Sequence, residues 1–455
     1  MNGIDDILQR QRCFFAGDFA PRTVAGRLDS LKRLKAAILA HTAEIEDALW
    51  KDLRKSPYET YVTEVGMAIE EIDGCLKRLG RWAKPERVAS PVMLFPSRSR
   101  IVREPYGLVL IIAPWNYPFQ LLMTPLISAV AAGNVVAVKP SEYAAHTAKV
   151  VGTVIREAFD ERHVSVFEGG ADVSTALLKQ RFDYIFFTGS ARVGRIVMAA
   201  AATHLTPVTL ELGGKSPCIV DASAHIAVAA QRIVWGKLLN AGQTCVAPDY
   251  LLVHTSVKTA LIEEMIRCIR LFYGEEARLS PDYPRLVSTA TADRLASLLE
   301  GATILYGGTV DREERYIEPT LLDVASLDCP LMREEIFGPL LPVCGISSVD
   351  EAVAYINSRP KPLALYYFGD TKRGRDVIRR TSSGGACIND TVLHIVNPAL
   401  PFGGVGESGM GSYHGRAGFE TFSHRRSVLV SATWIDIKLK YPPYRNKLKW
   451  MKRLW

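Results

Sequence analysis

The sequence predicts an α/β protein built from two doubly wound domains, and three observations support this prediction. At 455 residues the chain is longer than one domain usually is. From Gly107 onward, short apolar runs alternate with helix-like stretches, which is typical of parallel sheets whose strands are joined by helices. The composition, 48% hydrophobic and 23% charged, is that of an ordinary globular protein with a large core.

The N-terminal part is predicted to be helical and to be followed by an excursion from the domain body. Apolar residues recur there at the spacing of one helix face. They are Leu28, Leu31, Leu34, Ile38 and Leu39, and later Val65, Ile69 and Ile72. After Pro85 a stretch that contains proline and serine runs to about Arg103 and indicates the excursion.

Two groups of apolar runs predict two sheets. Each run is short and continuous, as expected of strands that are buried on both faces. The first group comprises residues 108–113, 135–138, 164–167, 184–187 and 208–210, and the second comprises residues 250–254, 340–344, 363–368 and 386–388. The simplest architecture is therefore two α/β domains that meet near residues 211–217.

Charge and cysteine content exclude several classes of protein. The net charge is +7, but the lysines and arginines of residues 437–455 account for all of it, and this segment contains no acid. A neutral body with a basic tail is not a nucleic-acid-binding domain. The eight cysteines are irregularly spaced and include no C-x-x-C pair, which favours a reducing, cytoplasmic location and no metal site.

A membrane span and a signal peptide are also not expected. The most apolar stretch, residues 121–138, is interrupted by threonine, proline, serine, glycine and asparagine. It is expected to form a buried helix, a turn and a buried strand. Residues 1–15 include Asp5 and Asp6 and lack the long apolar run of a signal peptide.

A glycine-bearing turn follows the strand that is predicted at residues 184–187. It reads Gly189-Ser-Ala-Arg-Val-Gly194 and leads into a helix whose free N–H groups attract phosphate. A P-loop would need a lysine after the last glycine, where Arg195 stands instead. Ala191 replaces the middle glycine of the common dinucleotide fingerprint. From spacing alone, a phosphate-binding turn and a turn without a ligand both remain open.

Cys245 lies on a loop, Asn240-Ala-Gly-Gln-Thr-Cys-Val-Ala-Pro248, that is bounded by glycine and proline. Such a loop suits a reactive thiol, although cysteine is also among the most buried structural residues. Thiol chemistry on a carbonyl needs an oxyanion donor and a base. Asn116 and Glu211 each follow a predicted strand and offer these groups. Asn116 can instead serve the turn beside Pro118, and Glu211 can instead bind a ribose about 20 residues after the glycine turn.

Segments along nearly the whole chain resemble the aldehyde dehydrogenase superfamily. The matching motifs are Pro114-Trp-Asn-Tyr-Pro-Phe119, Lys139-Pro-Ser-Glu142, Phe187-Thr-Gly-Ser190 with Val193-Gly194, Leu210-Glu-Leu-Gly-Gly-Lys-Ser-Pro217, Gly242-Gln-Thr-Cys245, Glu335-Ile-Phe-Gly-Pro339 and Pro401-Phe-Gly-Gly-Val-Gly-Glu-Ser-Gly409. Residues 247–250, 411–415 and 422–426 resemble the class 3 branch, whose members oxidise apolar aldehydes.

The resemblance implies a role for each motif. Cys245 would be the nucleophile, Glu211 the general base, and Asn116 the oxyanion donor together with the backbone N–H of Cys245. Tyr117 would contact the substrate. The implied cofactor residues are Lys139 and Glu142 for the adenosine ribose, Gly189, Ser190, Val193 and Gly194 for the turn beside the pyrophosphate and nicotinamide, and Glu335 and Phe337 for the nicotinamide ribose. The charge of Glu142 opposes a 2′-phosphate and Lys139 offsets it in part, so we expect NAD to be used and NADP to be tolerated.

The resemblance also implies a domain plan and a homodimer. A dinucleotide-binding domain would comprise residues 1–86 and 106–210, and a catalytic domain residues 211–415. A strand-built oligomerisation arm would comprise residues 87–105 and 416–440. The basic tail, residues 441–455, interleaves cations with tryptophan and leucine, so it suits the surface of an anionic membrane or a place packed on the protein.

The implied reaction is the NAD(P)-dependent oxidation of an apolar aldehyde to its carboxylic acid through a Cys245 thiohemiacetal and thioester. The alternative is an acylating enzyme that passes the thioester to coenzyme A, and Glu211 argues against it because such relatives generally lack the base. A cysteine hydrolase would need a histidine motif near Cys245, and none stands out. A non-catalytic role would leave the complete set of nucleophile, base and oxyanion donor unexplained.

Overall fold

The structure, a computed structural model, describes residues 2–17 and 20–454. Its first sheet has the strand order β17-β7-β6-β3-β4-β5. The strands are β3 (Leu108–Ile112), β4 (Val135–Lys139), β5 (Val164–Val166), β6 (Tyr184–Gly189), β7 (Val208–Leu212) and β17 (Gly409–Met410). All pairs are parallel except β17 with β7. The predicted α/β class with parallel sheets is therefore confirmed.

Helices cover both faces of this sheet because its strands are apolar on both sides. Val109 and Ile111 face one core, whereas Leu108 and Leu110 face another. The first core includes residues of α2 (Val24–Ala40), α3 (Thr42–Leu53), α5 (Gly66–Trp82), α6 (Gln120–Ala132) and α7 (Ala145–Ala158). The second includes residues of α1 (Asn2–Ala16), α8 (Ala171–Leu178) and α9 (Ala191–Ala202). This arrangement makes the sheet doubly wound.

The second sheet has the order β10-β13-β14-β9-β8-β15-β16 and is parallel except for β10. Its strands are β8 (Pro217–Val220), β9 (Tyr250–His254), β10 (Thr303–Tyr306), β13 (Thr320–Val324), β14 (Leu340–Ile346), β15 (Ala364–Phe368) and β16 (Gly385–Ile388), beside a small hairpin of β11 (Val310–Asp311) and β12 (Tyr316–Ile317). Residues of α10 (Ile226–Leu238) and α11 (Lys258–Tyr273) belong to the core that also serves the first sheet. Residues of α12 (Thr289–Ser297), α13 (Val349–Asn357) and α14 (Thr371–Arg380) contribute to a separate core.

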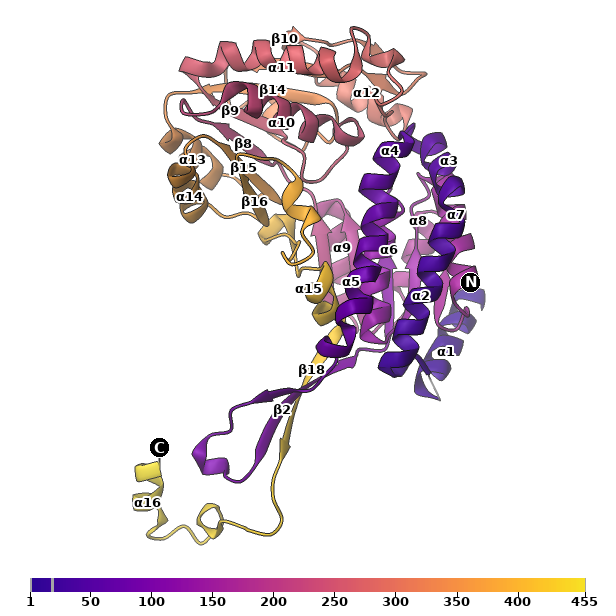
Figure 1. Cartoon of the computed structure of the whole chain (residues 1–455), viewed down its shortest axis with the longest axis vertical. Coiled ribbons are helices and arrows are strands. Elements are labelled where there is room, and N and C mark those ends of the chain that lie inside the picture. Colours follow the sequence, from indigo (N-terminus) through magenta and orange to yellow (C-terminus); the bar gives the residue numbers. More distant parts are fainter. Residues whose placement is uncertain (1, 18–19, 455) are drawn as a thin grey trace.

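An arm extends away from these two bodies (Figure 1). It is an antiparallel sheet of β1 (Glu86–Val88), β2 (Arg98–Pro105) and β18 (Ser423–Val430), with β2 in the centre. The chain continues past β18 to α16 (Lys447–Leu454) at the far end of the arm (Figure 1). The last residue of the predicted basic tail, Trp455, lies outside the described residues.

Two short segments pack on other parts of the structure than the predicted domain boundaries indicate. Residues 416–422, which the sequence analysis assigned to the arm, are in or next to α15 (Gly415–Thr421), and this helix packs on α5 and α6. Phe419 and Phe422 are buried there in the main core, which holds the segment on the body. The segment around β17 returns to the first sheet, where Gly409 lies opposite Glu211.

The apolar stretch of residues 121–138 forms a buried helix, a turn and a buried strand, as predicted. Helix α6 ends at Gly133, whose φ of 94° turns the chain into β4. None of the helices that the structure describes is long and apolar enough to cross a membrane.

Candidate active site

Several of the predicted site residues lie at the carboxyl edge of the first sheet. β3 lies between β4 and β6, so the strand order reverses at β3, and ligands of open α/β sheets usually bind at such a point. Asn116 lies on the loop after β3, Gly189 ends β6, and Glu211 lies near the end of β7. The parallel fold thus brings together segments that are far apart in the sequence.

The loop that carries Cys245 has an unusual backbone. Asn240 and Ala241 both have a φ of 53°, in the left-handed region, and Gly242 follows with a φ of 76°. A Cβ atom at Gly242 would collide with the carbonyl oxygen of Gly338, so this position requires glycine. The tight turn ends α10 and directs the chain to Cys245, which is half-buried.

Hydrogen bonds fix Asn116 and Tyr117 against this loop. The Asn116 Nδ2 donates to the carbonyl oxygen of Gln243 at 3.0 Å. The Asn116 carbonyl oxygen accepts from the Nδ2 of Asn240 at 2.7 Å. The Tyr117 hydroxyl lies 2.6 Å from the Thr244 Oγ1. The two loops are therefore held as one unit around the thiol.

Burial sets the protonation of the thiol and of the nearby carboxyl groups. Burial first, and then the charges of Glu335 and Glu211, raise the pKa of Cys245 to about 12, although backbone N–H groups lower it in part. Burial also raises the pKa of Glu211 well above its usual value and that of Glu335 to about 8. Both carboxyl oxygens of Glu211 are buried and make no hydrogen bond in the described structure. A carboxyl group in such surroundings is a strong base once it is deprotonated.

Cys245 opens onto a cavity of about 660 Å³. The wall is mostly apolar and comes from five separate parts of the chain. Its apolar side chains include Val62, Met67, Tyr117, Leu121, Trp235, Leu239, Phe272, Val392, Leu393, Ile395, Val396 and Phe402. Trp235, Leu393 and Val396 remain more than a third exposed, which places them toward the opening. A cavity of this size and character suits a mainly apolar small molecule.

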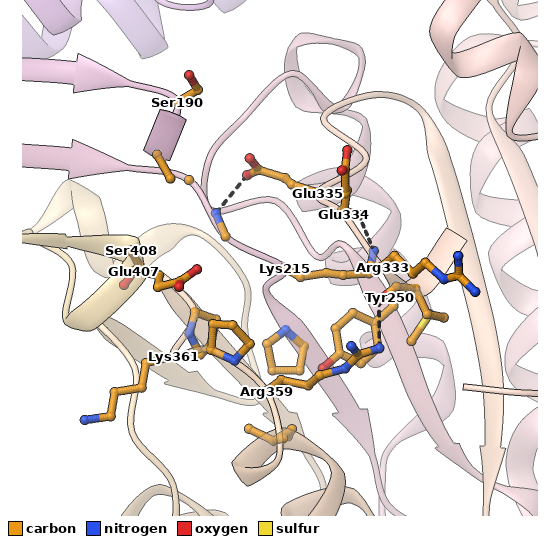
Figure 2. A pocket seen from close by; sticks show the side chains of 18 of the residues that line it. Ser190, Lys215, Tyr250, Arg333, Glu334, Glu335, Arg359, Lys361, Glu407 and Ser408 are labelled. Atoms are coloured by element: carbon orange, nitrogen blue, oxygen red, sulfur yellow. Dashed lines mark hydrogen bonds between the residues drawn. The ribbon is translucent and has the colours of Figure 1, made fainter. Parts of the chain in front are cut away.

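A second cavity, of about 450 Å³, lies between α9 and the second sheet (Figure 2). The Ser190 side chain caps α9 by accepting from the N–H of Val193. Ser190 and the first two residues of this helix, Ala191 and Arg192, line the cavity. The Oε1 of Glu335 accepts from the N–H of Gly214 at 3.1 Å, and Figure 2 draws this contact as the dashed line that begins at Glu335. The cationic side chains of the wall are Arg192, Arg195, Lys215, Arg333, Arg359 and Lys361. A helix N-terminus with cations suits a pyrophosphate, and a carboxylate suits ribose hydroxyls.

The other predicted cofactor residues do not line either cavity; they are Lys139, Glu142, Gly189, Val193, Gly194 and Phe337. Gly194 lets α9 approach β7, since a Cβ atom there would lie 2.7 Å from a methyl carbon of Leu212. Phe337 packs edge-on against Trp115, with ring centroids 5.5 Å apart. Lys139 ends β4 and its Nζ lies 2.5 Å from the Oε2 of Glu142. This last pair stands at the carboxyl edge of the sheet but outside the walls of both cavities.

Sequence reasoning missed several residues of the site. Segment 56–67, with Glu59 and Val62, lines the apolar cavity but carries no recognisable motif. Arg192 was not singled out, although it stands inside the glycine turn. Phe402 lies within the motif Pro401–Gly409, which the sequence analysis identified. The sequence did not reveal that its side chain lines the apolar cavity.

A doubly wound sheet with a polar cleft is typical of proteins that bind a dinucleotide. A thiol on which the charge of a buried carboxyl group acts fits an enzyme that uses covalent catalysis. Comparison with known proteins agrees with this class. Residues 7–428 match the model of the aldehyde dehydrogenase family, and the chain belongs to this family. It is an oxidoreductase that acts on aldehydes.

Similar proteins cover the whole chain. It is 48% identical over 455 residues to 4,4′-diaponeurosporen-aldehyde dehydrogenase of Staphylococcus aureus, covering 99% of each chain. It is 45% identical over 452 residues to the dimeric NADP-preferring aldehyde dehydrogenase of Rattus norvegicus, covering 98% of this chain and 99% of the relative. A solved structure described as the substrate-bound state of Staphylococcus aureus AldH has a TM-score of 0.97 at 48% identity, covering 100% of this chain and 99% of that one. Other similar proteins are named aldehyde dehydrogenase family 3, which confirms the class 3 resemblance.

Proposed function

We propose that this enzyme oxidises apolar aldehydes, medium- or long-chain aliphatic or aromatic, to carboxylic acids, using Cys245 as a covalent nucleophile. The observation that carries the proposal is the position of Cys245 at a largely apolar cavity of about 660 Å³. The similar enzyme of Staphylococcus aureus is named for a diaponeurosporen aldehyde. A cavity lined by apolar side chains favours substrates that leave water with their hydrocarbon part.

The chain supplies the groups for each step of the reaction. The Cys245 thiol loses its proton to solvent water, and the resulting thiolate attacks the carbonyl carbon, which gives the oxyanion of a thiohemiacetal. The Asn116 Nδ2 carries two N–H groups, of which one is donated to Gln243 and the other is oriented by the same contact toward the developing oxyanion. Loss of hydride converts the thiohemiacetal to a thioester. Glu211 then takes a proton from a water molecule, which attacks the thioester, releases the carboxylic acid and restores Cys245.

NAD is the proposed cofactor, with NADP tolerated, and when bound it supplies the acceptor for the hydride. The first turn of α9, capped by Ser190, would hold its pyrophosphate, and Glu335 would hold the nicotinamide ribose. Lys139 and Glu142 would share the adenosine ribose. Their mutual ion pair lowers the effective charge that a 2′-phosphate meets, which fits tolerance of NADP.

A panel of straight-chain aldehydes tests the substrate class. We expect kcat/KM with NAD to rise about three- to fourfold per added CH₂, because each buried CH₂ contributes about 0.8 kcal/mol, until the cavity is full. NADP should give lower kcat/KM values than NAD for every aldehyde.

Leu393→Asp at the opening should lower kcat/KM for the longest aldehydes and leave that for the shortest aldehydes unchanged. Leu279→Asp is the matched control, since Leu279 is 71% exposed and lies outside the cavity wall.

A flat dependence on chain length would contradict an apolar substrate. Coenzyme A added to the same assays separates hydrolysis from acylation. Formation of an acyl-CoA in place of the free acid would favour the acylating alternative.

The arm and tail are proposed to join two copies and to touch a membrane surface from the cytoplasm. Strand β18 is an edge strand, with Leu429 and Val430 about half exposed, and such an edge can pair with a second copy. In α16, Leu448 and Trp450 are exposed beside Lys447 and Lys449. Cations beside exposed apolar side chains suit an anionic lipid surface.

A chain that ends at Tyr441 separates these two proposals. Light scattering should give a dimer for both the full and the shortened chain, because the arm is intact in each. Vesicles of anionic lipid at low salt should sediment the full chain only. A monomer at micromolar concentration would contradict the dimer, and a full chain that stays in the supernatant would contradict membrane contact.

A further inference from the structure

A fully buried ion pair lies behind the site and has no part in the proposed chemistry. The Lys55 Nζ and the Glu64 Oε1 are 2.5 Å apart, and both side chains are 0% exposed. Charges without access to water are expensive to bury, and apolar side chains of similar volume usually serve stability as well or better. The pair therefore calls for a role other than stability.

Among the described residues, the other side-chain hydrogen bonds of this pair go to the loop that carries Asn116 and to the start of α6. The Lys55 Nζ also donates to the Asn116 carbonyl oxygen at 3.3 Å and lies 4.2 Å from the ring centroid of Tyr117. The Glu64 Oε2 accepts from the N–H groups of Phe119 and Gln120, at 3.0 and 2.9 Å. Lys55 and Glu64 thus hold the main chain on both sides of Tyr117.

The same carbonyl oxygen of Asn116 connects this pair to the loop of Cys245. It accepts from the Asn240 Nδ2 at 2.7 Å as well as from Lys55. Asn240 is held in turn through its own N–H, which donates to the Oε1 of the buried Glu59 at 2.8 Å. Segment 55–64 therefore forms hydrogen bonds with both the loop of Asn116 and the loop of Cys245. The Asn116 carbonyl oxygen accepts hydrogen bonds from Lys55 and from Asn240 of the second loop.

We propose that Lys55, held in place by Glu64, is a positioning residue that orients Asn116 toward the oxyanion. Fixing the Asn116 carbonyl fixes the peptide plane after this residue, and with it the direction of the Cβ atom and the side-chain amide. The proposal rests on the proposed oxyanion role of Asn116. Because Lys55 acts through Asn116, its loss should lower the rate of the chemical step and leave the binding of cofactor and substrate intact.

The test compares Lys55→Met with the double variant Lys55→Met/Glu64→Gln. The single change leaves the Glu64 charge buried without its cation, so a fall in melting temperature is expected. The double change removes both charges, and the glutamine oxygen can still accept from Phe119 and Gln120. We expect the melting temperature to recover in the double variant while kcat stays about 100-fold low, because a misplaced catalytic group costs that much. KM and the affinity for NAD, measured by fluorescence titration, should be unchanged.

A double-mutant cycle with Asn116→Ala identifies the route of the effect. In the Asn116→Ala background, Lys55→Met/Glu64→Gln should lower kcat no further. The matched control is Lys258→Met/Asp323→Asn, which removes a 2.5 Å pair between α11 and β13 and should leave kcat unchanged.

Each other outcome overturns a defined part of the argument. A normal kcat in Lys55→Met/Glu64→Gln, or a loss that multiplies that of Asn116→Ala, would overturn the positioning role alone. An Asn116→Ala variant with normal kcat would overturn the oxyanion role and this proposal with it.

Discussion

Replacing Cys245 by alanine is expected to abolish aldehyde oxidation while NAD binding persists. No other group in the apolar cavity can form the thiohemiacetal, so kcat should fall by roughly 10⁴-fold or more. The side chain is small and half-buried, so the variant should fold normally. Steady-state NADH formation measures the loss, and fluorescence titration measures the affinity for NAD.

A second cysteine provides the control for this prediction. Cys387 is also half-buried, and its Sγ lies 3.3 Å from the Nδ1 of His394, a pairing that could suggest a hydrolase nucleophile. Burial lowers the pKa of His394 to about 4 and raises that of the Cys387 thiol. The position of Cys387 separates it from Cys245, because Cys387 does not line the apolar cavity. Cys387→Ala should therefore keep normal turnover. Substantial aldehyde oxidation by Cys245→Ala, or loss of aldehyde oxidation in Cys387→Ala, would contradict the assignment of Cys245 as the nucleophile.

The strands were predictable because parallel sheets bury both faces of each strand. Residues 108–113 and 135–138 are continuously apolar, and they correspond to β3 and β4. The pairing of β17 with β7 was not predictable. Two residues, Gly409 and Met410, carry no strand pattern, and the burial of Phe402 and Tyr413 on either side of them in the main core depends on distant contacts.

The catalytic loops were predictable for a different reason. Asn116 and Glu211 stand at the ends of apolar runs, and parallel topology brings such ends to one edge. The sequence pattern did not identify the residues that hold these loops in place. Lys55 and Glu64 read as ordinary surface charges of a helical segment, and their burial depends on contacts with residues 116–120 that no local pattern reveals.

Glu211→Gln is expected to slow release of the product far more than formation of the thioester. The glutamine amide cannot take a proton from water, and a general base contributes about 10²- to 10⁴-fold. A rapid burst of NADH, approaching one equivalent per site, should therefore precede a slow steady state. Mixing enzyme, NAD and aldehyde in a stopped-flow instrument measures both phases. Hydroxylamine, a small nucleophile that needs no base, should speed the slow phase.

The pH dependence of the slow phase distinguishes a base from a structural carboxyl group. Burial raises the pKa of Glu211 well above its usual value, so the active carboxylate is lost as pH falls through that raised pKa. Deacylation by the unaltered enzyme should therefore quicken with rising pH, and the Gln variant should lose this dependence. Glu335→Gln is the matched control, because it removes the other carboxyl group whose charge acts on Cys245 and should weaken NAD binding without a burst. If Glu211→Gln instead weakened only NAD binding, Glu211 would be a ribose ligand and the water would need another base.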